Sequence, residues 1–293
     1  MRTQDVDEPV IAAASRTPFE SRRRVFVLER VETMNDEVAN RLLKTLEEPA
    51  SFVHLLLVTD ALDQVLPTVV SRCQLVRFDR LPAHRIAAEL ERDGVAPDRA
   101  AACAGLALGN AARARYLASE EGEALRADAD RIVTAALAGG SARAAGAPEP
   151  WRGLLDRAEE RRAAAEAVVA DACRERLESE PKGRERTALE RSFEETARRD
   201  GRRARTEILD LGLTLAALRF RDLVCLAEGA KEAALDPDRA ESLAASARAR
   251  DPRRLRAAAE RCEDVRLSLE VNVTEDLALD ALGFRLARLV GAA

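Results

Sequence analysis

Residue types that carry out chemistry are few in this chain and lie far apart. The only histidines are His54 and His84, and no two cysteines form a C-x-x-C pair. A zinc site needs closely spaced ligands, so the cysteines are interpreted as reduced structural thiols. No G-x-x-x-x-G-K-[ST] sequence occurs that could cradle phosphates with backbone N–H groups. The cysteines are Cys73, Cys103, Cys173, Cys225 and Cys262.

Two segments are strongly basic, and the first is a candidate for contact with nucleic acid. Arg22, Arg23 and Arg24 precede an apolar run, and a cluster of this kind can bind a DNA phosphate. Arginines beside an aggregation-prone strand more often serve as solvated gatekeepers, and this interpretation is preferred. Residues 181–205 carry nine Lys or Arg and five Asp or Glu, a net of +4. A mixed-charge, solvated helix is the preferred interpretation there.

Composition excludes several classes of protein. Hydrophobic residues make up 47% and charged residues 34% of the 293, as in folded soluble domains rather than disordered chains. The net charge of −5 gives no global electrostatic case for binding nucleic acid, so any contact must come from a local patch. The first ten residues lack the apolar run of a signal peptide, and no uncharged apolar stretch is long enough to span a membrane. A cytoplasmic location is therefore expected.

The first eighty residues predict a βαβ unit. Residues 24–28 and 54–58 are continuous apolar runs, typical of parallel strands that are buried on both faces. Between them, Thr33 and Asp36 match a capping box at the start of a helix, which Pro49 ends. The run from Gln74 to Phe78 predicts a third strand.

After Pro82 the pattern is helical. Several short helices are expected up to residue 137, with breaks near Gly94–Pro97 and at Gly109–Asn110. Long helices are expected over residues 151–178, 184–228 and 251–290. The prediction is thus a mainly α protein with four segments: a small α/β piece at 1–81, a small helical domain at 82–138, a Gly- and Pro-rich linker at 139–150, and a larger helical domain at 151–293.

Two long motifs carry a resemblance to a known family. N-R-L-L-K-T-L-E-E-P ends at Pro49, and L-P-T-V-V-S-R-C ends at Cys73. In this order and separation they resemble the AAA+ clamp-loader subunits of bacterial DNA polymerase III. Arg219–Leu223, and Leu269–Val273 followed by Leu277–Leu279, resemble parts of the collar domain of that family. The resemblance implies a partial AAA+ core, a helical lid and a helical collar for oligomerisation.

Within the family, three departures favour the non-hydrolysing, delta-prime type. The phosphate loop is absent, Glu29-Arg30 replaces the acidic Walker B pair, and Ala112 stands where active subunits carry a sensor arginine. In relatives a phosphate-loop strand, and often a zinc-binding cysteine cluster, precedes the position of Arg24. The chain is therefore interpreted as N-terminally truncated, with the missing strand expected between strands 54–58 and 74–78.

Arg72 is the principal candidate for function. The resemblance implies that this arginine, flanked by Ser71 and Cys73, reaches across a subunit interface as an arginine finger to a neighbour's ATP. The alternative is a surface arginine near a helix end. Thr59 corresponds to the first sensor position, but a strand-end hydrogen-bonding role is preferred.

The helix of the first motif has two open interpretations. Its polar residues either form i,i+4 pairs on a solvated face, as Lys44 with Glu48 and Glu37 with Arg41 could, or line a central chamber or subunit contact. The residues concerned are Asn40, Lys44, Glu47 and Glu48.

The function implied by the resemblance is that of a non-catalytic clamp-loader subunit. It would have no cofactor or metal of its own, since a neighbour holds ATP and Mg²⁺. It would join gamma/tau and delta subunits and act on the sliding clamp and primer–template DNA through the complex, away from any membrane. The alternatives are a gamma/tau-like ATPase whose phosphate loop lies upstream, and a helical scaffold that kept only the collar.

Overall fold

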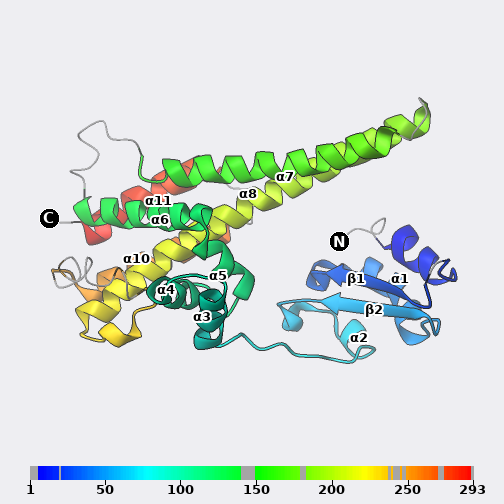
Figure 1. Cartoon of the computed structure of the whole chain (residues 1–293), viewed down its shortest axis with the longest axis horizontal. Coiled ribbons are helices and arrows are strands. Elements are labelled where there is room, and N and C mark those ends of the chain that lie inside the picture. Colours follow the sequence, from blue (N-terminus) through cyan, green and yellow to red (C-terminus); the bar gives the residue numbers. More distant parts are fainter. Residues whose placement is uncertain are drawn as a thin grey trace. The chain divides into compact units, whose positions relative to one another are not determined.

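A computed structural model describes residues 6–19, 21–139, 149–178, 183–236, 239, 245, 249–269 and 274–291. The chain forms two compact units, Met1–Asp79 and Arg80–Ala293. The first contains a two-stranded parallel sheet and short helices, and the second is helical throughout the part that is described (Figure 1). The predicted fold class, mainly α with a partial α/β piece, is confirmed.

The sheet of the first unit consists of β1 (Arg24–Glu29) and β2 (Val53–Val58). The strands are parallel and in register from Arg24 opposite Val53 to Glu29 opposite Val58. Both strands were predicted from their apolar runs.

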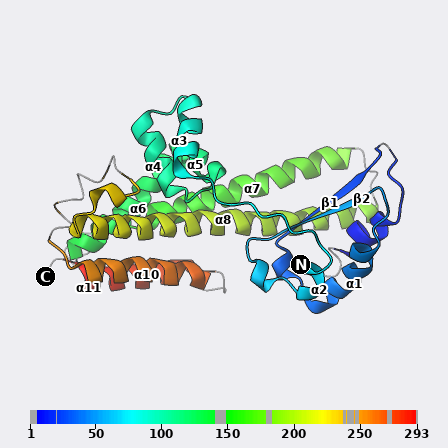
Figure 2. The same cartoon turned by 90° about the horizontal axis from the view of Figure 1, so that it is seen from below.

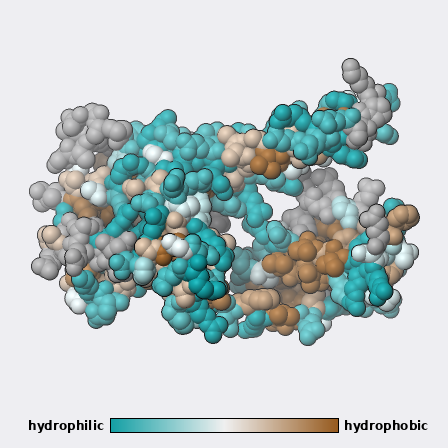
Figure 3. Space-filling view, viewed as in Figure 1, coloured by the Kyte–Doolittle hydropathy of each residue, from teal (hydrophilic) through white to brown (hydrophobic). Residues whose placement is uncertain are grey.

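Only one face of this sheet is covered, so the prediction of burial on both faces was wrong. Side chains alternate between faces along a strand. Phe26, Leu28, Leu55 and Leu57 pack into the core, whereas the residues of the opposite face are 50–59% exposed. In Figure 3 a hydrophobic area lies over the strands of this unit. The exposed residues of this face are Val25, Val27, Leu56 and Val58.

The predicted third strand is not formed. Gln74–Phe78 has no regular secondary structure, and Leu75, Val76 and Phe78 are 49%, 64% and 92% exposed. A strand is stabilised by backbone pairing with a neighbour, and this segment has none in the described sheet. Apolar residues alone do not therefore make it a strand.

Helix α1 (Asp36–Glu47) connects the strands and covers the buried face with Val38 and Leu42. The predicted Thr33–Asp36 capping box was wrong. Asn35 is the N-cap, and its Oδ1 accepts a hydrogen bond of 3.0 Å from the Val38 N–H. Thr33 instead ends a 3₁₀ turn and donates its hydroxyl to the Arg30 carbonyl at 2.7 Å. The helix ends shortly before Pro49, as predicted.

Short elements complete the first unit. They contribute Val6, Val10, Val31, Val65 and Val69 to the small core beneath the sheet. These elements are η2 (Asp7–Ala12), η3 (Val31–Thr33), η4 (Leu62–Gln64) and α2 (Pro67–Val70).

The second unit begins with four helices: α3 (Ala83–Arg92), α4 (Pro97–Leu106), α5 (Ala111–Ala118) and α6 (Glu120–Ala138). The breaks fall at Gly94 and Gly109, as predicted. Gly109 has φ +88°, and a Cβ there would lie 2.6 Å from the Arg80 Cβ, so glycine is required for both reasons. A further break, at Ser119, was not predicted. Its hydroxyl accepts a hydrogen bond of 3.2 Å from the Gly122 N–H and so caps α6.

Four longer helices follow: α7 (Arg152–Glu178), α8 (Arg184–Ala227), α10 (Pro252–Ser268) and α11 (Glu275–Val290), with the short turn η6 (Lys231–Ala233) after α8. Helices α7 and α8 form a hairpin, and α10 packs along the later part of α8 (Figures 1 and 2). These helices agree with the predicted long ones.

A single core joins the helices predicted as a lid, 82–138, to those predicted as a collar, 151–293. One cluster of buried residues runs from Ile86 of α3 to Val290 of α11. Helix α6 connects the two parts because it packs against α5 on one side and against α8 and α11 on others. Most of the predicted linker, residues 140–148, and most of the predicted collar motif, residues 270–273, lie outside the described residues.

Candidate functional site

Arg72 lies directly after α2, at the end of the second motif. Its Nε donates to Glu47 Oε1 at 2.5 Å, and its Nη2 is also 2.5 Å from that oxygen. Its Nη1 donates to the Thr68 carbonyl at 2.9 Å and to Ser71 Oγ at 3.3 Å. The guanidinium is thereby held at the surface, with 33% of the side chain exposed.

This arrangement brings the two motifs together, because Glu47 ends α1 and Arg72 follows α2. Sequence reasoning named both residues but did not predict their pairing. No periodic pattern relates residues 25 positions apart in different elements. The ion pair is thus a result of tertiary packing.

The two residues that flank Arg72 have structural contacts. Ser71 Oγ donates to the Thr68 carbonyl at 3.2 Å, which helps to close the last turn of α2. Cys73 is half-buried beside the core of the unit, and burial raises the pKa of its thiol. A neutral thiol is a poor nucleophile, which favours a structural role for Cys73.

The other predicted residues of α1 lie apart from Arg72. Asn40 and Lys44 are exposed, and the predicted pair of Glu37 with Arg41 is present at 3.1 Å. Within the described ranges, Lys44 and Glu48 form no ion pair. Of the candidates on α1, therefore, Glu47 alone contacts Arg72.

The arginines at the start of β1 lie at the amino end of the sheet. Arg23 Nη1 is 2.8 Å from His54 Nε2, and Arg24 donates to the Ala13 carbonyl. Arg22 is exposed. These contacts hold Arg23 and Arg24 against their own unit. The choice between a solvated gatekeeper and a phosphate contact stays a prediction.

The carboxyl edge of the sheet carries Thr59, Glu32 and Arg30. Thr59 donates its hydroxyl to Glu32 Oε2 at 2.7 Å and accepts from the Ala61 N–H at 3.1 Å. Arg30 adopts the left-handed region with φ 57°, and its Nε lies 3.6 Å from Glu32 Oε1. Thr59 therefore makes the strand-end hydrogen bonds that were preferred for it. In the second unit, Ala112 is exposed on α5, and its correspondence to a sensor arginine stays a prediction.

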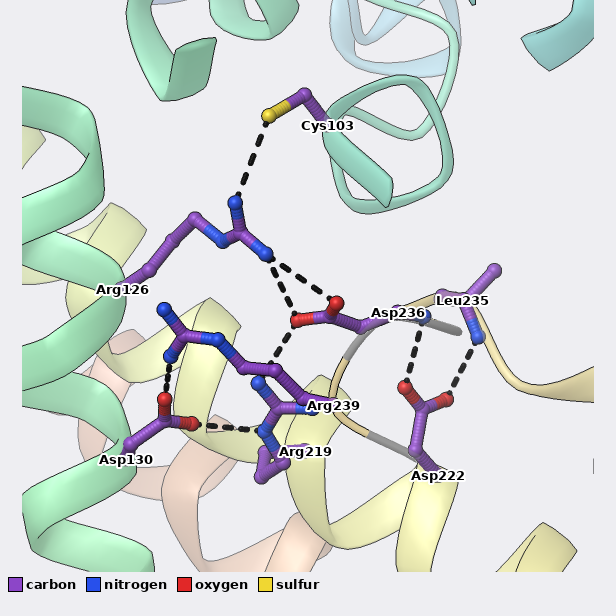
Figure 4. A network of polar contacts seen from close by, with 8 residues as sticks. All are labelled: Cys103, Arg126, Asp130, Arg219, Asp222, Leu235, Asp236 and Arg239. Carbon is purple, nitrogen blue, oxygen red and sulfur yellow. Dashed lines mark hydrogen bonds and ion pairs between the residues drawn. The ribbon is translucent and has the colours of Figure 1, made fainter. Parts of the chain in front are cut away.

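A second polar cluster, not predicted as a site, is buried in the helical unit (Figure 4). Asp236 is fully buried and accepts from Arg126 Nη2 at 3.1 and 3.2 Å and from Arg219 Nη2 at 2.8 Å. Arg219 Nε also donates to Asp130 Oδ1 at 2.8 Å, and Arg239 pairs with Asp130. The three arginines pair with Asp130 and Asp236, and Asp222 pairs with Arg221 at 3.1 Å.

Asp222 uses its carboxylate to hold the backbone after α8. It accepts from the Leu235 N–H at 3.0 Å and from the Asp236 N–H at 3.2 Å. Burial raises the pKa of Asp222, and these N–H donors and Arg219 partly oppose that rise. Burial also lowers the pKa of Arg239. Arg219 and Asp222 belong to the collar-like motif. The contacts of the cluster show that these two residues hold α6, α8 and the segment after α8 together.

In the described part of the chain, no three His, Cys, Asp or Glu side chains are grouped so that they could hold a metal ion. No helix there is both long and apolar enough to cross a membrane.

Comparison with known proteins places the resemblance in the first unit. Residues 2–82 match the family model described as DNA polymerase III, delta subunit. The chain is 34% identical over 86 residues to DNA polymerase III subunit delta' of Bacillus subtilis, which covers 29% of this chain and 26% of that protein. It is 49% identical over 51 residues to subunit delta' of Pseudomonas aeruginosa, covering 17% and 16% of the two chains.

A gamma subunit is also similar. DNA polymerase III subunit gamma of Buchnera aphidicola is 33% identical over 70 residues, which covers 24% of this chain and 19% of that protein. A solved gamma subunit-related protein of Thermotoga maritima aligns at TM-score 0.42 and 15% identity, over 98% of this chain and 79% of that chain. The matched stretch thus spans about a quarter or less of each curated relative. The predicted resemblance to DNA polymerase III subunits is confirmed for this part of the chain.

Proposed function

We propose that this chain acts as a delta-prime-type subunit of a bacterial DNA polymerase III clamp loader. It assembles with gamma/tau and delta subunits in the cytoplasm and hydrolyses no ATP itself. Arg72 serves a neighbouring subunit that binds ATP and Mg²⁺. The sliding clamp and the primer–template DNA are reached through the complex.

The observation that carries this proposal is the position of Arg72. It lies in the motif that ends at Cys73 and resembles one of clamp-loader subunits, and its guanidinium is held at the surface by Glu47 and the Thr68 carbonyl. A guanidinium presents a planar fork of N–H donors that suits carboxylates and phosphates alike. A terminal phosphate of a neighbour's ATP can therefore replace Glu47 as the acceptor. The fork then stabilises the charge that develops on the transferred phosphoryl group.

Glu47 has a defined role in this mechanism. In the free subunit, Glu47 holds the Arg72 guanidinium in one position and neutralises its positive charge. The pair is partly exposed, so its contribution to stability is small, about 1 kcal/mol or less. Exchanging it for a phosphate contact is therefore energetically accessible.

The residues at the carboxyl edge of the sheet support the proposal that this subunit hydrolyses no ATP. Catalysis needs a carboxylate that holds Mg²⁺ and another group that orients the attacking water. Here Glu32 accepts the Thr59 hydroxyl, and the cationic Arg30 lies beside it. A positive side chain at this point opposes binding of Mg²⁺.

The test is Arg72→Ala in a clamp loader reconstituted from the whole chain and its partner subunits. ATP hydrolysis stimulated by primed DNA and the clamp should fall, while assembly measured by gel filtration is retained. Such fingers contribute about a thousandfold or more at the interface they serve, but total turnover falls less because other interfaces keep their own arginines.

Two further variants sharpen this test. Arg72→Lys keeps the charge but loses the planar fork, so it should not restore the rate. Arg254→Ala removes an exposed arginine of α10 and should leave hydrolysis unchanged. Wild-type hydrolysis in the Arg72→Ala complex would remove Arg72 from the mechanism.

The similarity to a gamma subunit makes an ATP-hydrolysing subunit the second candidate. Titration of the full-length gene product with a labelled ATP analogue separates the two. We expect no binding at micromolar concentrations, and saturable binding would favour the gamma type.

A further inference from the structure

The first half of α8 carries an exposed row of arginines: Arg184, Arg191, Arg198 and Arg202. An α-helix turns by about 100° per residue, so residues seven apart are displaced by only about 20° around the axis. Arg202 lies five turns after Arg184 and returns to the same side. The four side chains therefore follow one line along the helix, termed here the arginine row.

The row lies opposite the face that packs on α7. Leu189, Phe193 and Ala197 are half-buried along the hairpin, and Gly201 is buried against Glu166. Leu189 and Phe193 lie about half a turn from the arginine row, and Ala197 and Gly201 lie about a quarter to a third of a turn from it. All four arginines are exposed to solvent as a result.

None of the four arginines forms an ion pair within the described residues. This distinguishes them from their neighbours: Arg186 pairs with Glu190 at 3.2 Å and Arg203 with Glu207 at 2.9 Å. Glu194 and Glu195 are the exposed acidic residues beside Arg191 and Arg198, so the row has four positive charges and two negative charges next to them. The resulting net charge of +2 contrasts with −5 for the whole chain.

We infer that the arginine row of α8 binds the phosphate backbone of duplex nucleic acid. From Arg184 to Arg202 the helix rises about 27 Å, which equals about eight base pairs of a duplex. Exposed guanidinium groups that form no ion pair within the described residues can donate to phosphates where the row crosses a backbone strand of the duplex. The contact uses phosphates alone, so it should be independent of base sequence.

The composition of the row argues against other polyanions. Single strands are bound largely by stacking on aromatic rings, and Phe193 lies in the hairpin interface rather than beside the row. Binding to an anionic membrane needs large apolar residues next to the basic ones. The residues between the arginines of the row include Thr187, Ala188 and Glu195, which cannot insert into lipid.

The experiment measures binding of a fluorescent 20-base-pair duplex of arbitrary sequence to the whole chain by anisotropy, at several salt concentrations. Four phosphate contacts give a slope of about −3.6 in a plot of log affinity against log salt. This slope corresponds to a loss of about 150-fold between 50 and 200 mM salt. Replacing the four arginines of the row by glutamine should abolish the slope and the binding.

The control removes the same charge elsewhere. Changing four exposed arginines of other helices to glutamine should leave the slope within about one unit of wild type. Both variants must retain the wild-type helical circular dichroism. The control positions are Arg85, Arg92, Arg254 and Arg285.

Several outcomes would overturn the inference. The first is an equal loss of duplex affinity in the row variant and the control variant. The second is binding by the wild-type chain that does not depend on salt. The third is tighter binding to a single strand, an acidic peptide or anionic vesicles than to the duplex. The inference depends on α8 alone. Arg72→Ala should therefore leave duplex binding unchanged, and a failure of the proposed arginine finger would be seen separately.

Discussion

At the scale of single residues, Asp236 is a buried carboxylate that pairs with two arginines of the helical unit. It is fully buried and accepts from both Arg126 and Arg219. Removing one partner of a buried ionic cluster leaves the others uncompensated, which is far more costly than losing an exposed pair.

We predict that Asp236→Asn lowers the free energy of unfolding by about 3–5 kcal/mol, measured by urea denaturation. The amide keeps the size of the side chain but leaves two buried guanidinium groups facing a neutral group. The matched control is Asp264→Asn, since Asp264 is 59% exposed and pairs with Arg261 at 2.8 Å. Its cost should be below about 1 kcal/mol. Equal costs in the two variants would show that the cluster does not hold the fold.

Cys262 gives a second prediction at this scale. Burial raises its pKa to about 12, so at pH 8 only about one thiol in ten thousand is ionised. Alkylation of Cys262 in the native protein should therefore be negligible and should appear only on unfolding, as followed by mass spectrometry. Cys173, which is half-buried on α7, serves as the internal comparison and should be modified first. Modification of both thiols at the same rate would contradict the packing of α10.

At the scale of elements, local signals predicted most of the helices. Proline and glycine set the ends of α1, α3 and α4 because their backbone preferences act without tertiary contacts. Capping was less predictable. Thr33 and Asn35 are both good N-cap residues, and the 3₁₀ turn at Val31–Thr33 decides between them.

The strands were only partly predictable from local sequence. The apolar runs at β1 and β2 identified the strands but did not show that one face of the sheet is uncovered. Gln74–Phe78 has similar residues and forms no strand, because pairing depends on a neighbour rather than on composition. The contacts of the candidate site were likewise not predictable from local sequence. The motif identified Arg72, but its contact with Glu47 depends on how α1 and α2 pack.

At the scale of the whole molecule, the two units should differ in stability. The first has a small core and a two-stranded sheet with one exposed apolar face. Few buried contacts and open strand edges favour local unfolding. The second unit has a core that extends through all its helices.

We predict from this contrast that amides of β1 and β2 exchange with solvent much sooner than those in the middle of α8. Hydrogen exchange followed by mass spectrometry measures both in one sample. The amides of α6 and α10 serve as controls for the helical unit and should exchange as slowly as those of α8. Equal protection in both units would mean that the sheet is stabilised by contacts beyond its small core.

The continuous core of the second unit has a mechanical consequence. Helix α6 buries Leu125, Ile132 and Val133 between the early and the late helices. Opening a hinge there would expose these side chains to water, at about 1.5–3 kcal/mol each. Helix α6 therefore holds the early and the late helices together. A displacement of α3 or α5 should move the hairpin of α7 and α8 with it, without bending at α6. A partner that binds either end of the second unit would therefore move that unit as one rigid body.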